Sequence, residues 1–286
     1  MSILRHRHVI TSATRHFKGL AIGIALCALS TTAAADWRPV AVDTLTQAAD
    51  GRRLVVLGEM HGTREIPLLA GDLVERWSDA SPVLLALEIP AREHDALREA
   101  VASGGADAAI ERLRQRAWWQ VPADENDGRR SEDVLALVRR VGHLKASGRD
   151  VAILPFDPRD LRCHRRGNCE AAMAHVLRRA HEAFPRGRLV VVTGNVHAMR
   201  SRPADAPAGY PGQPMTALLQ DLSPYSVNAT AARGAYWACG ETCGTVDVAP
   251  SRGGGREVPN SPFDYRLVLP VFTPIRQVER VDGDNR

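Results

Sequence analysis

Ionisable or amide side chains follow four short apolar runs of this chain, each at the point where the run ends. In chain order they are Glu59, His61, Glu88, Asp157, Asn195 and His197. A histidine beside a carboxylate can serve as a general base, because the carboxylate fixes the imidazole tautomer. Alternatively, histidine and glutamate side chains can bind a divalent metal ion. Both arrangements activate water, so the pattern predicts a site suited to hydrolysis.

Roles for these side chains follow from their types. The expected catalytic group is Glu59, His61, Glu88 and His197, and the expected substrate-binding group is Asp157, Asn195 and Arg129. Arg129 could bind a substrate carboxylate through two N–H groups, or it could belong to a solvated turn. The sequence contains no G-x-S-x-G nucleophile elbow, no G-x-G-x-x-G after a strand and no P-loop, which argues against a serine hydrolase and against nucleotide cofactors.

The four runs must be strands that bring these groups together. They cover residues 54–57, 83–87, 151–154 and 189–192, and helical patterns separate them. Near-continuous Val, Leu and Ile runs separated by helices are typical of parallel strands buried on both faces. The sequence therefore predicts an α/β fold: a mostly parallel central sheet with helices on both faces. Two further strands are expected in the C-terminal third, within 225–239 and 265–272.

The first 35 residues have the pattern of a secretory signal peptide. A basic stretch ends at Lys18, an apolar run follows, and Ala33-Ala34-Ala35 offers a cleavage site before Asp36. We therefore expect residues 36–286 to form a single α/β domain, periplasmic or secreted, without a stable membrane anchor after cleavage; an uncleaved anchor is the alternative. The four basic residues of the leader equal the formal net charge of +4, so the charge balance does not indicate a nucleic-acid partner.

Four cysteines remain after the leader, in two local pairs. In an oxidising compartment the spacing predicts disulfides between Cys163 and Cys169 and between Cys239 and Cys243. A four-cysteine zinc site is the alternative, although five and three intervening residues are looser than the usual spacing of two.

Several of these motifs together resemble a known superfamily. They are Gly58-Glu59-Met60-His61-Gly62-Thr63, Leu87-Glu88, Trp118-Trp119, Phe156-Asp157, Ala172-Met173-Ala174 and Gly194-Asn195-Val196-His197. The set is similar to the superfamily that joins erythromycin esterases, ChaN-like haem-binding uptake proteins and Tiki-type proteases. The resemblance spans residues 54–200.

The resemblance implies an α/β fold and a site that contains Glu59, His61, Glu88 and His197. In the esterase branch the histidine of the first motif activates water, in Tiki-type proteases matching His and Glu positions bind a metal, and in the third branch the ligand is haem. This chain departs from the esterase pattern at residues 168–171, where Asn-Cys-Glu-Ala stands in place of an Arg-Asp pair before Met-Ala. That departure weighs against macrolide hydrolysis.

The sequence thus predicts an exported, hydrolase-like protein that activates water at a His/Glu site. The alternative is a ChaN-like haem-binding or iron-uptake protein without catalysis. Haem or a divalent metal are both open as cofactors, and a small molecule or haem is the expected ligand. If carboxylates surround His61, they should raise its pKa above the ordinary 6.5 despite burial.

Overall fold

The structure is a computed structural model, and it describes residues 36–280 except 159–162, 164–166, 253 and 258. The predicted signal peptide, residues 1–35, lies outside the described residues.

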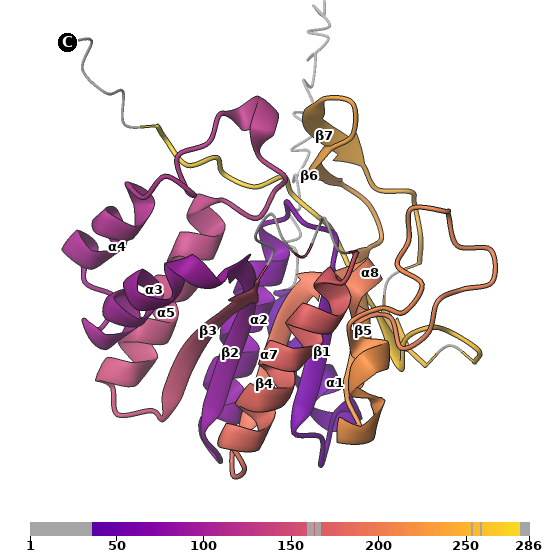
Figure 1. Cartoon of the computed structure of the whole chain (residues 1–286), viewed down its shortest axis with the longest axis horizontal. Helices are drawn as coiled ribbons and strands as arrows, with labels where there is room; N and C mark the ends of the chain where they lie inside the picture. The colour runs from indigo at the N-terminus through magenta and orange to yellow at the C-terminus, as the bar shows by residue number, and fades with distance from the viewer. Residues whose placement is uncertain (1–35, 159–162, 164–166, 253, 258, 281–286) are drawn as a thin grey trace, which may run out of the picture. The chain divides into compact units, whose positions relative to one another are not determined.

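Helices and strands alternate through most of the described chain (Figure 1). The elements, in order, are α1 (Trp37–Ala48), β1 (Leu54–Glu59), α2 (Glu65–Trp77), β2 (Val83–Pro90), the 3-10 helix η1 (Ala91–Glu93), α3 (His94–Ala102), α4 (Asp107–Arg114), η2 (Ala123–Glu125), α5 (Glu132–Ala146), β3 (Val151–Asp157), α7 (Cys169–Ala183), β4 (Arg188–Gly194), α8 (Asn195–Ala198), η3 (Thr216–Leu222), β5 (Tyr225–Ala231), β6 (Ala235–Cys239), β7 (Cys243–Asp247), β8 (Gly254–Arg256) and β9 (Tyr265–Leu269).

Within the described residues, seven strands form one sheet in the order β3-β2-β4-β1-β5-β9-β8. All neighbours are parallel except β8 and β9. The predicted α/β class and the mostly parallel sheet are therefore confirmed.

Alternate residues of the central strands face two separate apolar cores. In β1, Val55 and Leu57 pack with α1, α2, α3, α4 and α5, whereas Leu54 and Val56 pack with α7, α8 and η3. Because successive side chains of a strand point to opposite faces, this division places helices on both faces of the sheet, as predicted. Figure 1 shows α7 and α2 on opposite sides of the sheet.

Local signals account for several helix boundaries. The Ser131 hydroxyl accepts a hydrogen bond from the Val134 N–H at 3.1 Å and so caps α5. The break between α3 and α4 falls at Gly104 and Gly105, which have φ values of 73° and 72°. A Cβ at Gly105 would lie 2.4 Å from the carbonyl oxygen of Arg139, so α5 can pack this closely only against glycine.

The C-terminal third adds strands, but the expected strand over 225–239 is divided. β5 joins the large sheet beside β1, whereas β6 pairs with β7 in a separate antiparallel hairpin. The chain turns at Gly234, which has a φ of 102° and would place a Cβ 2.1 Å from the carbonyl oxygen of Phe272. The expected strand over 265–272 is β9, over Tyr265–Leu269.

Candidate functional site

The carboxyl ends of the adjacent strands β3, β2, β4 and β1 bring most of the expected site residues to one edge of the sheet. Glu59 ends β1, and its register partner in β4 is Gly194. Glu88 and Asp157 lie at the ends of the neighbouring β2 and β3. His61 follows β1 within two residues, and His197 lies in α8, which begins directly after β4. This edge is where open α/β sheets bind their ligands.

Glu88 lies at the centre of the cluster, and its side chain is 3% exposed. Its Oε2 atom accepts hydrogen bonds from the Thr193 hydroxyl at 2.6 Å and from the Gly194 N–H at 2.8 Å. Burial alone would raise the pKa of Glu88, but the charges of His61, His197 and Arg129 and the hydrogen bond with His61 hold it well below its usual value. Glu88 is therefore a fixed negative charge and a poor base.

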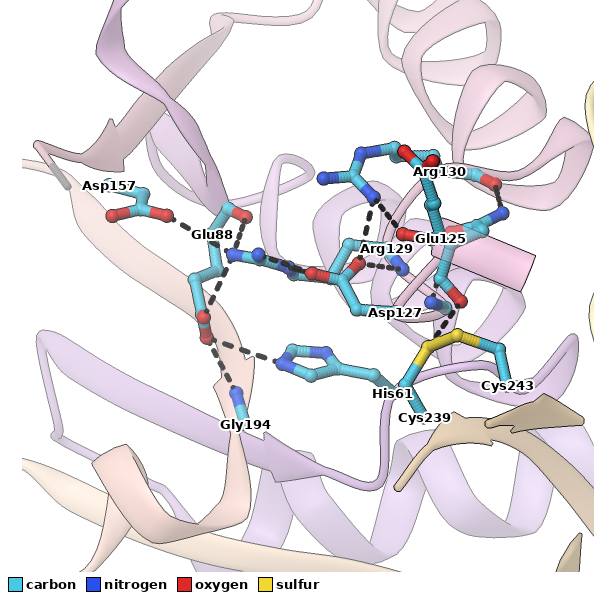
Figure 2. Close-up of polar contacts among 12 residues, drawn as sticks. His61, Glu88, Glu125, Asp127, Arg129, Arg130, Asp157, Gly194, Cys239 and Cys243 are labelled. Atoms are coloured by element: carbon cyan, nitrogen blue, oxygen red, sulfur yellow. Dashed lines mark hydrogen bonds and ion pairs between the residues drawn. A yellow bond between two sulfur atoms is a disulfide. The ribbon is translucent and has the colours of Figure 1, made fainter. Parts of the chain in front are cut away.

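His61 lies between two carboxylates (Figure 2 draws the contact with Glu88). Its Nδ1 atom is 2.9 Å from Glu59 Oε1, and its Nε2 atom is 3.6 Å from Glu88 Oε2. Burial alone would lower the pKa of His61, but Glu88 and Glu59 outweigh it and raise the pKa to about 10. The predicted direction is correct, and at neutral pH His61 is a cation.

His197 approaches Glu88 from the other side. Its Nε2 atom is 3.8 Å from Glu88 Oε1, and its Nδ1 atom is 2.6 Å from Glu170 Oε1. The other oxygen of Glu170 accepts the Met215 N–H at 2.6 Å. Each histidine is thus held at Nδ1 by a carboxylate of its own, and both direct Nε2 toward Glu88.

Glu170 was absent from the predicted site. It lies in the first turn of α7, after strand β3, at the position where the chain departs from the esterase pattern. The only sequence signal is an acidic residue beside Cys169 in the first turn of a helix, and such residues are common for electrostatic reasons alone.

Arg129 is largely buried and paired with three carboxylates, so the alternative of a solvated turn residue does not hold. Its Nη1 atom is 3.2 Å from Glu88 Oε1 and 3.1 Å from Asp157 Oδ2, and its Nη2 atom is 2.5 Å from Asp127 Oδ2 (Figure 2). Burial alone would lower the pKa of Arg129, but Glu88, Asp127 and Asp157 raise it overall. Asp157 and Arg129 therefore form part of the charge network around Glu88. Asp127, which the sequence analysis did not select, completes it.

Asn195 is the first residue of α8 and is half-buried. Gly58 lets this short helix approach β1, because a Cβ at Gly58 would lie 2.6 Å from the Cβ of Ala198. The glycine of the first motif thus serves the position of His197, which is carried on α8.

The β6–β7 hairpin packs on the first motif. Gly62 has a φ of 86°, and its carbonyl oxygen accepts the Trp237 N–H at 2.9 Å. A Cβ at Gly62 would lie 1.9 Å from the carbonyl oxygen of Trp237. The Trp237 indole donates to the carbonyl of Asn126 at 2.8 Å, and Cys239 Sγ lies 3.1 Å from the same oxygen. The hairpin therefore connects the His61 segment with the loop that carries Arg129.

Both predicted cysteine pairs are disulfides in the structure, between Cys163 and Cys169 and between Cys239 and Cys243. The first ends immediately before Glu170, and the second closes the hairpin that packs against Gly62. Among the described residues, no helix is long and apolar enough to cross a membrane.

Trp118 and Trp119 are buried, with exposed fractions of 5% and 1%, and their rings meet edge to face with centroids 4.8 Å apart. Their burial supports a role in packing.

A small cavity of about 30 Å³ lies beside Glu59, Glu88 and Arg129, with apolar side chains of α2, α5, β2 and β4 on its other side. It has room for water but not for a macrocycle. In the part of the chain that the structure describes, no group of three or more His, Cys, Asp or Glu side chains is arranged to hold a metal ion. The four cysteines are paired as disulfides and do not form the alternative zinc site.

No protein-family model matches this chain, and no curated protein matches it in sequence. Solved structures do match in fold. A protein described as a succinoglycan biosynthesis protein has a TM-score of 0.61 at 11% identity, over 82% of this chain and 92% of its own. A protein from Bacillus cereus has a TM-score of 0.55 at 11% identity, over 84% of this chain and 93% of its own.

A mutant of the erythromycin esterase EreC, in its open conformation, has a TM-score of 0.51 at 14% identity, over 84% of this chain and 80% of its own. Its presence among the structural matches confirms the predicted resemblance at the level of the fold. At these identities the likeness concerns the fold alone.

Proposed function

We propose that the protein is a hydrolase that activates water at the cluster of Glu88, His61 and His197. The observation that carries this proposal is the position of the buried Glu88 carboxylate, 3.6 Å from His61 Nε2 and 3.8 Å from His197 Nε2. Each imidazole is also oriented at Nδ1 by a second carboxylate, 2.9 Å away for His61 and 2.6 Å away for His197. Two oriented imidazoles at one sheet edge suit acid–base catalysis of an acyl transfer to water.

The two histidines have different roles in this proposal. His61, with a pKa of about 10, is protonated at neutral pH and serves as the acid. Glu170 lies 2.6 Å from Nδ1 of His197 and orients the ring, and the neutral form of His197 would accept a proton at Nε2, so we assign His197 as the base. In this proposal the base is therefore His197. The resemblance to the esterase branch instead favours His61 as the residue that activates water.

These two histidines carry out both proton transfers of the reaction. The water oxygen bonds to the acyl carbon, and the water proton passes to His197 Nε2. The bond from the acyl carbon to the leaving oxygen breaks, and that oxygen takes the Nε2 proton of His61. Exchange with solvent then restores both histidines. Glu88 stays ionised throughout and holds the positive charge of His61 at the reacting centre.

The metal alternative would use the same residues. A carboxylate at each Nδ1 would orient Nε2 of His61 and His197 for a metal ion as well as for water, so a chelator experiment separates the two. Two disulfides fit an oxidising compartment, which supports the proposed export to the periplasm or the medium.

The test is an ester and peptide hydrolysis screen with wild type and the variants His61→Asn and His197→Asn. Both variants should fold, because these side chains are about one-fifth exposed and lie beyond the apolar cores. Each should lower kcat/KM by about 100-fold or more. Glu182→Gln, in an exposed position of α7, is the matched control and should keep full activity. Full activity in both folded histidine variants would contradict the proposal.

A further inference from the structure

An open cavity of about 470 Å³ lies next to the candidate site and plays no part in the proposed chemistry. It is lined by Arg92, Glu93, Arg116, Ala117, Trp118, Val121 and Arg130. Its elements belong to the same edge of the sheet, since η1 directly follows β2 and Arg130 directly follows Arg129. Its volume is in the range of small-molecule sites.

The cavity has a surplus of positive charge. Three arginines line it, and the one acidic side chain among its lining residues is Glu93. That carboxylate is already paired, with Arg116 Nε at 2.5 Å and Arg92 Nε at 3.9 Å. Arg92 and Arg116 are 64% and 41% exposed, so they can still reach a ligand.

Arg130 is the buried member of the set, with a side chain that is 14% exposed. Its nearest carboxylate, Asp127 Oδ1, is 3.6 Å away, and the other oxygen of Asp127 lies 2.5 Å from Arg129. Figure 2 shows Asp127 contacting both arginines. One carboxylate thus serves two cations.

The hydrogen bonding of Arg130 is also incomplete. Its Nη1 atom donates to the Glu125 carbonyl at 3.2 Å, whereas its Nε atom is buried without a hydrogen-bond partner. Burial lowers the pKa of Arg130 against the opposing effect of Asp127, and the charges of Arg129 and Arg92 lower it further. A bound anion would compensate this buried charge.

The remaining walls are apolar. Ala117 and Val121 line the cavity, and the guanidinium of Arg130 lies 5.2 Å from the ring centroid of Trp118. The cation–π contact holds the guanidinium plane in place, so that less freedom is lost when it binds a ligand. An apolar wall beside planar N–H donors suits a molecule with an apolar body and an anionic end.

We propose that this cavity, with Arg130 as its buried anchor and Arg92 and Arg116 at its rim, binds the carboxylate or phosphate end of a small molecule with an apolar body. The structure supports this through the surplus of cations, the incomplete pairing of Arg130 and the size of the cavity. If the protein is the proposed hydrolase, the cavity selects anionic substrates for the neighbouring site. The binding of anions does not depend on that function.

Direct binding tests the cavity without reference to activity. Isothermal titration calorimetry with benzoate, phenyl phosphate and the neutral benzamide should show that the anions bind about tenfold or more tightly than benzamide. The tighter of the two anions identifies which end group the cavity prefers. Affinity for both should fall as salt is raised, because two of the arginines are exposed.

Substitutions locate the binding. Arg130→Gln should weaken anion binding about tenfold or more, Arg130→Lys by less, and Arg92→Gln by about two- to fivefold. Arg179→Gln, which removes an exposed arginine of α7, should leave binding unchanged. If Arg130→Gln does not fold, Arg92→Gln and Arg130→Lys decide the matter, since Arg92 is mostly exposed. Equal binding of benzoate and benzamide, or unchanged anion affinity in the folded variants, would overturn the proposal.

Activity separates this proposal from the hydrolytic one. Anion binding that weakens in Arg130→Gln, in a protein that hydrolyses no ester or peptide, would support the cavity and count against the hydrolase. Hydrolysis without any preference for anions in binding would support the hydrolase and count against the anion-binding cavity. If both hold, Arg130→Gln should raise KM for a p-nitrophenyl ester with a free carboxylate, with kcat unchanged and a neutral ester unaffected.

Discussion

Replacing Glu59 by Gln tests the electrostatics of the site. The pKa of His61 rises from 6.5 to about 10, a preference for the charged form of about 5 kcal/mol. Glu59 contributes through the 2.9 Å hydrogen bond to Nδ1, and Glu88 contributes from the other side. An opposite charge at this distance accounts for about 1–3 pH units. We therefore expect the pKa of His61 to fall to about 7–9 in Glu59→Gln, which an NMR titration of the histidine ring would measure.

The lower pKa of His61 in Glu59→Gln also determines how the difference in stability between the variant and wild type depends on pH. A group whose pKa is raised in the folded state stabilises fully below its unfolded pKa, and that contribution is lost as pH rises through the folded value. Urea denaturation should therefore show Glu59→Gln to be less stable than wild type by about 1–4 kcal/mol at pH 6. The difference should shrink as the pH rises above the pKa of His61 in the variant, and it should disappear above about pH 10.

Two results would refute this account of His61. One is an unchanged pKa of His61 in Glu59→Gln, and the other is a stability difference that is equal at pH 6 and above pH 10. Glu182→Gln, the exposed α7 variant, should match wild type at every pH and controls for the loss of a negative charge.

Three further predictions concern the frame of the site and its chemistry. Gly62→Ala should destabilise the protein by about 1–3 kcal/mol or more in thermal or chemical denaturation, because φ is 86° and the new Cβ would meet the Trp237 carbonyl; unchanged stability would show that the hairpin does not pack there. Peptide mapping without reduction should find all four cysteines at 163, 169, 239 and 243 in disulfides, and Cys239→Ser/Cys243→Ser should lower the melting temperature; four free thiols would contradict this. Any hydrolysis should survive treatment with a chelator, and loss of activity that a divalent metal restores would reject the metal-free mechanism in favour of a metallohydrolase.

The sequence predicts the fold because local signals determine it. The four apolar runs become β1, β2, β3 and β4, and their parallel pairing brings their carboxyl ends to one edge. The boundary between β5 and β6 is wrong in the prediction, since it depends on a close approach between Gly234 and Phe272, far apart in sequence.

Some residues of the candidate site can likewise be predicted from the sequence, and others cannot. His61, Glu88 and His197 can be selected because each lies at the end of a strand or within three residues after it. Glu170 and Asp127 cannot, because their roles arise only when α7 and the loop before Arg129 fold over the sheet edge. The roles of the histidines also depend on distances: a carboxylate 2.9 Å from Nδ1 and another 3.6 Å from Nε2 change His61 from a base into an acid.

The pH–rate profile of wild type tests the central claim most directly. With His61 as the acid, kcat/KM for an alkyl ester, whose leaving oxygen needs a proton, should have a basic limb near pH 10, where the imidazolium loses its proton. Glu59→Gln should move this limb to lower pH, in step with the pKa measured for His61. A rate that instead rises through pH 10 as His61 loses its proton, or a basic limb that stays in place in Glu59→Gln, would contradict the assignment.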